Sequence, residues 1–187
     1  MSMDATIVPR LTASGQAIDT APERFGTLES SINLLDDPLA LRERMHQEGY
    51  LYLPGYLDRG EVLAARREIA ERLAAAGHTE PGTQPIDLVA RAGLDIAFTP
   101  DLAIDNPPLY QLLYSGRMMA FFAQFLGGEV RHYDFTWLRT VAPGRGTAPH
   151  MDIVFMGRGT TNVYTTWTPL GDVPLEMGGL MILERSH

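Results

Sequence analysis

The sequence has 187 residues, of which 45% are hydrophobic and 20% charged, which is typical of one globular domain with a hydrophobic core. Its net charge of -8 argues against binding to nucleic acid or to an anionic membrane surface. No cysteine is present, so disulfides, thiolate metal sites and cysteine nucleophiles are excluded, and any metal must be bound by His and carboxylate.

The first 30 residues show no hydrophobic periodicity. They contain neither the basic start and apolar stretch of a signal peptide nor a run of membrane-spanning length. We therefore expect a mobile N-terminal tail over residues 1–30 and one domain over residues 31–187, in a cytoplasmic protein.

A short helix and a strand are expected after the tail. Asp37 is suited to cap a helix over residues 38–48, because its side chain can accept hydrogen bonds from the first turn while Pro38 occupies that turn. Gly49 would end this helix. Residues 50–53 then have the composition of a strand.

Two longer helices follow. Asp58 and Glu61 have the spacing of a capping box, and apolar residues continue at helical intervals toward Gly77, where the helix should end. Asn106 and two prolines open another helix, over residues 109–126, which should stop at the Gly-Gly pair that comes next.

From residue 130 onward, β-branched and aromatic residues are interrupted by Gly and Pro turns, which is typical of strands. Four strands are expected, over residues 130–142, 151–156, 161–170 and 179–184. Helices first and strands afterwards indicate an α+β fold with a mainly β core, in which the helices pack against one face of a β-sandwich or barrel.

Four pairs of the form His-x-Asp or His-x-Glu occur, where chance placement predicts about 0.6. Side chains two residues apart share a face on a strand, but on a helix they lie about 200° apart around the axis. The helical context therefore excludes His46 and Glu48 as joint metal ligands. The Gly- and Pro-rich loop around His78 and Glu80 offers no rigid element to hold an ion.

The other two pairs are expected on strands. For His132 and Asp134, hydrogen bonding within the fold is the alternative to metal binding. His150 and Asp152 follow the turn-rich residues 143–149 and enter the next strand, at a position where barrels build open metal sites. A surface ion pair is the alternative for them. These two residues are the candidate metal ligands and catalytic residues.

Three blocks of the sequence resemble the phytanoyl-CoA dioxygenase family. The first, EGYLYLPGYLDRGEVLAARREI, is similar to that family's opening strand, Pro-Gly turn and helix. The second, LRTVAPGRGTAPHMD, is similar to its strand, Pro-Gly loop and His-x-Asp motif. The third, YTTWTPLGDVPLEMGGLMILERSH, is similar to its Trp-bearing strand, turn and final strand. With the blocks in the family's order, the resemblance runs from about residue 41 to residue 187.

The resemblance implies a double-stranded β-helix, the cupin-like jelly roll, with Fe(II) bound by two His and one carboxylate. His150 and Asp152 would be two of these three ligands, and 2-oxoglutarate and dioxygen would be the cosubstrates. The implied reaction is hydroxylation of a small organic substrate. Asp152 favours hydroxylation over halogenation, because related halogenases lack the carboxylate.

Two further residues are candidates for cofactor binding. Trp167 matches a tryptophan that the family places near the 2-oxoglutarate site, and ordinary core packing is its alternative. Arg139 alternates in phase with Phe135 and Trp137 on the expected strand, so its guanidinium could point into a barrel and bind a carboxylate.

The resemblance ends before the family's third ligand, a distal His, and the Arg that anchors 2-oxoglutarate. His187 matches a His that is not a ligand in the family, and about half of the barrel strands are missing. We therefore expect this chain to be part of a longer polypeptide, whose other part is needed for activity. A catalytically silent jelly-roll scaffold and a cupin-like metal-dependent isomerase or hydrolase are the alternative functions.

Overall fold

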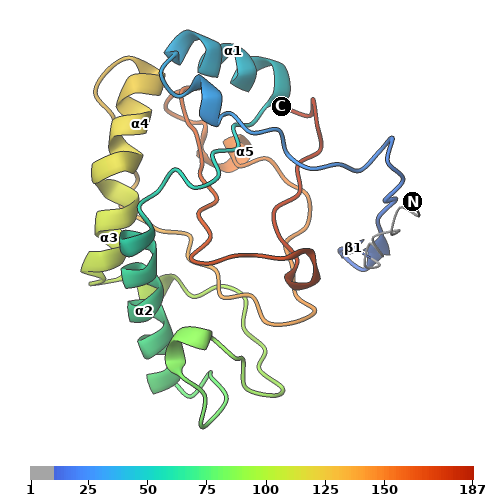
Figure 1. Cartoon of the computed structure of the whole chain (residues 1–187), viewed down its shortest axis with the longest axis vertical. Helices are drawn as coiled ribbons and strands as arrows, with labels where there is room; N and C mark the ends of the chain where they lie inside the picture. Colours follow the sequence, from blue (N-terminus) through green and yellow to red (C-terminus); the bar gives the residue numbers. More distant parts are fainter. Residues whose placement is uncertain (1–10) are drawn as a thin grey trace, which may run out of the picture. The chain divides into compact units, whose positions relative to one another are not determined.

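The structure is a computed structural model that describes residues 11–187. Figure 1 shows the course of the chain, which divides by its residue contacts into two compact units. Glu29–Arg145 forms one, which we call the helical unit; Gly146–His187 and the described residues up to Leu28 form the other, which we call the terminal unit. The single domain over residues 31–187 stays a prediction.

The first helix of the helical unit, α1 (Pro38–Glu48), forms as predicted. Asp37 caps it, since its Oδ1 accepts hydrogen bonds from the amides of Leu39 and Ala40 at 3.0 Å. Gly49 ends it with a φ of 78°, a left-handed conformation that glycine adopts without a steric penalty.

The core of the helical unit is built where α1 packs against α4 (Gly116–Leu126). Leu41, Phe121 and Phe125 are its buried centre. The rings of Phe121 and Phe125 stack with their centroids 5.8 Å apart. Burying side chains of this size stabilises the fold by about 1.5–3 kcal/mol each.

A second helical pair consists of α2 (Arg59–Ala75) and α3 (Pro107–Tyr114). The Asp58 carboxylate accepts a hydrogen bond from the Glu61 amide at 3.0 Å, which confirms the predicted start of α2. Buried apolar side chains lie on both helices: Ala65, Ile69, Ala70 and Leu73 on α2, and Leu109 and Leu112 on α3.

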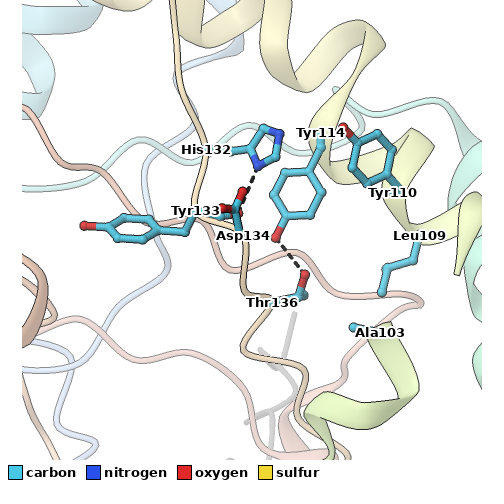
Figure 2. A pocket seen from close by; sticks show the side chains of 8 residues that line it. All are labelled: Ala103, Leu109, Tyr110, Tyr114, His132, Tyr133, Asp134 and Thr136. Atoms are coloured by element: carbon cyan, nitrogen blue, oxygen red, sulfur yellow. Dashed lines mark hydrogen bonds between the residues drawn. The ribbon is translucent and has the colours of Figure 1, made fainter. Parts of the chain in front are cut away.

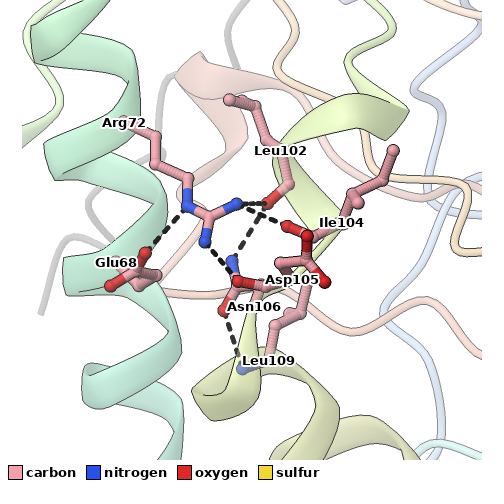
Figure 3. Close-up of polar contacts among 7 residues, drawn as sticks. All are labelled: Glu68, Arg72, Leu102, Ile104, Asp105, Asn106 and Leu109. Atoms are coloured by element: carbon pink, nitrogen blue, oxygen red, sulfur yellow. Dashed lines mark hydrogen bonds and ion pairs between the residues drawn. The ribbon is translucent and has the colours of Figure 1, made fainter.

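Hydrogen bonds connect α2 to the loop that precedes α3 (Figure 3). Arg72 Nε lies 2.8 Å from the Glu68 carboxylate. The other guanidinium nitrogens donate to three backbone carbonyls at 2.6 to 3.3 Å, those of Leu102, Ile104 and Asp105. Buried Asn106 caps α3, because its Oδ1 accepts from the Leu109 amide at 3.1 Å.

The prediction of one helix over residues 109–126 is wrong. Ser115, between α3 and α4, is extended, with a φ of -147° and a ψ of -170°. Its Oγ donates to the Gln111 carbonyl at 2.7 Å, and Gly116 has a φ of 50°. A hydroxyl that binds a helix carbonyl and a left-handed glycine together break the helix, although the apolar pattern continues through them.

Regular strands are confined to a short hairpin in the described part of the chain, β1 (Thr12–Ala13) and β2 (Gln16–Ala17). Ser14 and Gly15 both have positive φ, as a tight hairpin turn requires. The hairpin lies within the expected N-terminal tail. The mobility of that tail stays a prediction, and residues 1–10 lie outside the described residues.

The other segments expected as strands do not form them. Residues 50–53 make one parallel bridge, between Ser30 and Tyr52, and residues 130–142, 161–170 and 179–184 have no regular secondary structure. A strand needs a paired neighbour for its backbone N–H and C=O groups, and these segments have no such ladder among the residues described. The jelly roll stays a prediction.

Short helical turns complete the structure: η1 (Ile32–Leu34), η2 (Pro85–Asp87), η3 (Pro100–Ala103), α5 (Ile153–Met156) and η4 (Leu175–Met177). Over residues 11–187, none of the helices is both long and apolar enough to cross a membrane.

Candidate functional site

His150 and Asp152 lie side by side in the terminal unit. Nε2 of His150 is 3.3 Å from Oδ1 of Asp152, and the two side chains are 41% and 38% exposed. The Gly- and Pro-rich residues 143–149 lead to His150, and α5 begins directly after Asp152. Both donor atoms are therefore close to each other and open to solvent.

The pair does not lie on a strand, because the chain forms a helical turn after it. The amides of Phe155 and Met156 both donate to the Asp152 carbonyl, at 2.9 and 3.0 Å. The Gly157 amide donates to the Ile153 carbonyl at 2.9 Å, and a Cβ added at Gly157 would lie 2.8 Å from that oxygen. The strand predicted for this segment is wrong, since a glycine at this position lets the turn close tightly.

Both ring nitrogens of His150 face hydrogen-bond acceptors. Nδ1 lies 2.8 Å from the carbonyl oxygen of Ala148, and Nε2 faces the carboxylate of Asp152. A neutral imidazole carries one N–H and cannot donate to both oxygens. The arrangement is compatible with a cation shared between Nε2 and the carboxylate.

A divalent metal ion fits this pair of donors. Metal-binding histidines commonly donate their other N–H to a backbone carbonyl, as Nδ1 can do here to Ala148. Adjacent ligands about 2.1 Å from an ion in an octahedral site lie about 3 Å apart, close to the observed 3.3 Å. Two ligands do not complete a site, and residues 11–187 contain no group of three His, Cys, Asp or Glu side chains that could hold a metal ion.

The candidate cofactor residues lie in different units. In the helical unit, Cζ of exposed Arg139 lies 5.6 Å from the centroid of the Phe98 ring, a cation–π contact. In the terminal unit, Trp167 is 51% exposed. Roles for Arg139 and Trp167 in binding 2-oxoglutarate stay predictions.

His132 and Asp134 line a cavity of about 300 Å³ in the helical unit, beside α3 (Figure 2). The His132 ring stacks on Tyr114 with their centroids 4.3 Å apart, and its Nδ1 lies 2.9 Å from the Tyr133 carbonyl oxygen. The Tyr114 and Thr136 hydroxyls are hydrogen-bonded at 2.7 Å. The Nδ1 contact is of the kind that the hydrogen-bonding alternative for His132 predicts, and the ring stack on Tyr114 was not predicted.

The two remaining His-x-Glu pairs, at residues 46 and 48 and at residues 78 and 80, lie in the helical unit. His46 lies in the last turn of α1, as predicted. The chain around His78 and Glu80 is hydrogen-bonded to a later segment, with an isolated antiparallel bridge between Thr79 and Ala90. The Arg91 amide donates to the His78 carbonyl at 2.9 Å, and the Glu80 amide donates to the Val89 carbonyl at 2.8 Å. These contacts hold the loop locally, and as predicted neither a helix nor a named strand carries His78 or Glu80.

An ion pair at the start of the loop before His150 was missed. Two guanidinium nitrogens of Arg145 donate to the two carboxylate oxygens of Asp95, at 2.8 and 2.5 Å. Hydrogen bonding to this carboxylate raises the pKa of Arg145 above its ordinary value. The partners are 50 residues apart, so no periodicity links them; the only sequence signal is an Arg flanked by glycines.

Two curated proteins are similar to this chain, and both are named 1-deoxypentalenic acid 11-beta-hydroxylase. The protein from Streptomyces exfoliatus is 28% identical over 162 residues, which cover 82% of this chain and 56% of the relative. The protein from Streptomyces arenae is 27% identical over 175 residues, which cover 88% of this chain and 60% of the relative. The chain thus spans less than two thirds of either relative. No family model matches it, and no solved structure does.

Proposed function

We propose that the complete protein is a non-haem Fe(II)- and 2-oxoglutarate-dependent dioxygenase that hydroxylates a small organic substrate, as its resemblance to the phytanoyl-CoA dioxygenase family implies. The observation that carries the proposal is the His150–Asp152 pair, in which an imidazole nitrogen and a carboxylate face each other at 3.3 Å. The names of the two relatives support a hydroxylase.

In this proposal His150 and Asp152 hold the iron. The bound iron, with 2-oxoglutarate and dioxygen, supplies the oxidising power for placing oxygen in a C–H bond. The Ala148 carbonyl would accept a hydrogen bond from Nδ1–H of His150 and so orient the ring with Nε2 toward the iron. Trp167 would pack against cosubstrate or substrate, and Arg139 would pair with a carboxylate.

We further propose that a double-stranded β-helix surrounds this site in the complete protein. Large apolar side chains are exposed along the segments 161–170 and 179–184 that would supply strands, including Tyr164, Trp167, Leu180, Met181 and Leu183. Extended apolar surface of this kind is usually covered. The match covers 56% and 60% of the two relatives. In this proposal, residues equivalent to the unmatched part of the relatives supply the third ligand and the remaining strands.

The relatives also give a starting point for the substrate. Both are named for a carboxylic acid, so small organic acids are the first class to assay. Identity of 27–28% leaves pocket side chains free to differ, and the fold does not fix the substrate.

The test is oxygen-dependent conversion of 2-oxoglutarate to succinate by the complete protein loaded with Fe(II). His150→Ala and Asp152→Ala should each lower this turnover by more than about 100-fold, since even outer-shell partners of a metal are worth about 10–100-fold. His132→Ala is the matched control and should keep the activity. Substrate conversion without dioxygen would favour an isomerase or hydrolase, and a folded protein without any turnover would favour a silent scaffold.

A further inference from the structure

Two segments of the helical unit that have no regular secondary structure run antiparallel, as two backbone hydrogen bonds between them show. The Thr99 amide donates to the Leu138 carbonyl at 3.0 Å, and the Ala142 amide donates to the Ile96 carbonyl at 2.8 Å. As the residue number falls along one segment, it rises along the other. Asp95 is therefore the neighbour of Ile96 on the side toward which the second segment continues beyond Ala142.

A β-turn follows at once on the second segment. The Arg145 amide donates to the Ala142 carbonyl at 3.1 Å, with Pro143 and Gly144 at the two central positions. Gly144 has a φ of 80°, and Pro followed by a left-handed Gly is the signature of a type II turn. Buried Ala142 anchors the turn in the unit, and the turn presents Arg145 beside Asp95.

The resulting ion pair is bidentate but exposed. Its side chains are 55% and 67% exposed for Arg145 and Asp95, so it should add little to the stability of the fold. Two parallel N–H···O bonds do, however, fix direction as well as distance. A pair of this kind is suited to positioning the chain that follows it.

We propose that Asp95 and Arg145 form a clasp that fixes the start of the connection to His150 and thereby positions His150 for metal binding. Arg145 is five residues before His150 and three before Ala148, whose carbonyl holds the imidazole. A short connection anchored at its start samples fewer conformations, which preorganises a ligand. The anchoring is argued only from the hydrogen bonds and the ion pair described above. Its effect on metal binding rests on the proposed function.

The anchoring is tested on the metal-free protein by the rate at which proteinase K cleaves within residues 143–150. Arg145→Ala and Asp95→Ala should each accelerate this cleavage several-fold, and the exchanged pair Asp95→Arg with Arg145→Asp should restore the slow rate. Arg24→Ala is the matched control, because it removes another exposed ion pair, with Asp19 at 3.0 Å, and should change nothing. Unchanged cleavage in Arg145→Ala would overturn the clasp.

The positioning role is tested by calorimetric titration of the complete protein with Co(II). Each single variant should weaken binding about 3- to 10-fold, below the range for partners that touch a ligand directly, and the exchanged pair should restore it. Equal affinity in wild type and Arg145→Ala would overturn the positioning role. Absence of Co(II) binding in the wild type would instead contradict the proposed function, and the cleavage rates would still decide on the clasp.

Discussion

At the scale of single residues, the proposed function rests on how His150 is surrounded. Two oxygen acceptors face its two ring nitrogens, one from Ala148 and one from Asp152. A metal ion at Nε2 relieves the conflict between a single N–H and two acceptors. Both side chains are partly exposed, so a cation can reach Nε2 and the carboxylate from solvent.

The buried side chain of Asn106 makes two hydrogen bonds that support the start of α3. It is 4% exposed, accepts from the Leu109 amide and donates to the Leu102 carbonyl. Asn106→Ala should lower the free energy of unfolding by about 1–2 kcal/mol, because the cap is lost and buried partners stay unsatisfied. Urea denaturation measures this, with Asn33→Ala, an exposed asparagine in the same unit, as the control. Equal losses in both variants would contradict the capping role.

At the scale of elements, capping residues could be predicted from the sequence better than chain pairing. Asp37 and Asp58 cap the helices expected of them, since a cap depends on residues three positions apart. The break at Ser115 and the turn after Asp152 were missed, because one hydroxyl and one glycine override the apolar pattern. The Asp95–Arg145 pair joins residues far apart in sequence, and only the folded chain reveals it.

The tight helical turn after Asp152 gives a prediction for α5. Gly157→Ala should distort the turn, because the new Cβ would meet the Ile153 carbonyl at 2.8 Å. Distortion would reorient the Asp152 backbone, so Co(II) affinity should fall several-fold. Gly159→Ala is the matched control, since a Cβ there meets nothing within 4 Å. Calorimetric affinities that are equal in the two variants would show that α5 does not support the pair.

At the scale of the whole molecule, most buried apolar side chains belong to the helical unit, whereas the terminal unit carries the His150–Asp152 pair and many exposed apolar residues. The sequence predicted helices followed by strand-like residues within one domain over residues 31–187, and it did not predict the division into two units. The His-x-Asp spacing identified His150 and Asp152 as candidate metal ligands, but we expected them to lie on a strand. Pairing of strands depends on neighbours distant in sequence, so the local pattern could not decide it.

This division predicts unequal responses to similar substitutions. Phe125 is 1% exposed and Phe155 is 69% exposed. In the 187-residue chain, Phe125→Ala should lower the free energy of unfolding by about 3–5 kcal/mol through the cavity it leaves, and Phe155→Ala should change it by less than about 0.5 kcal/mol. Chemical denaturation followed by circular dichroism measures both. A large loss in Phe155→Ala would show that the terminal unit has a core of its own around that ring.

The central claim is that His150 and Asp152 bind Fe(II) for 2-oxoglutarate chemistry. The most direct measurement is an anaerobic titration of the complete protein with Fe(II) and 2-oxoglutarate, followed by the weak metal-to-ligand charge-transfer absorption in the visible range, with His150→Ala as the control. We expect the band to appear only when both metal and 2-oxoglutarate are present, and to be lost in the variant. A folded wild-type protein that shows no band, or a band that survives in His150→Ala, would contradict the claim.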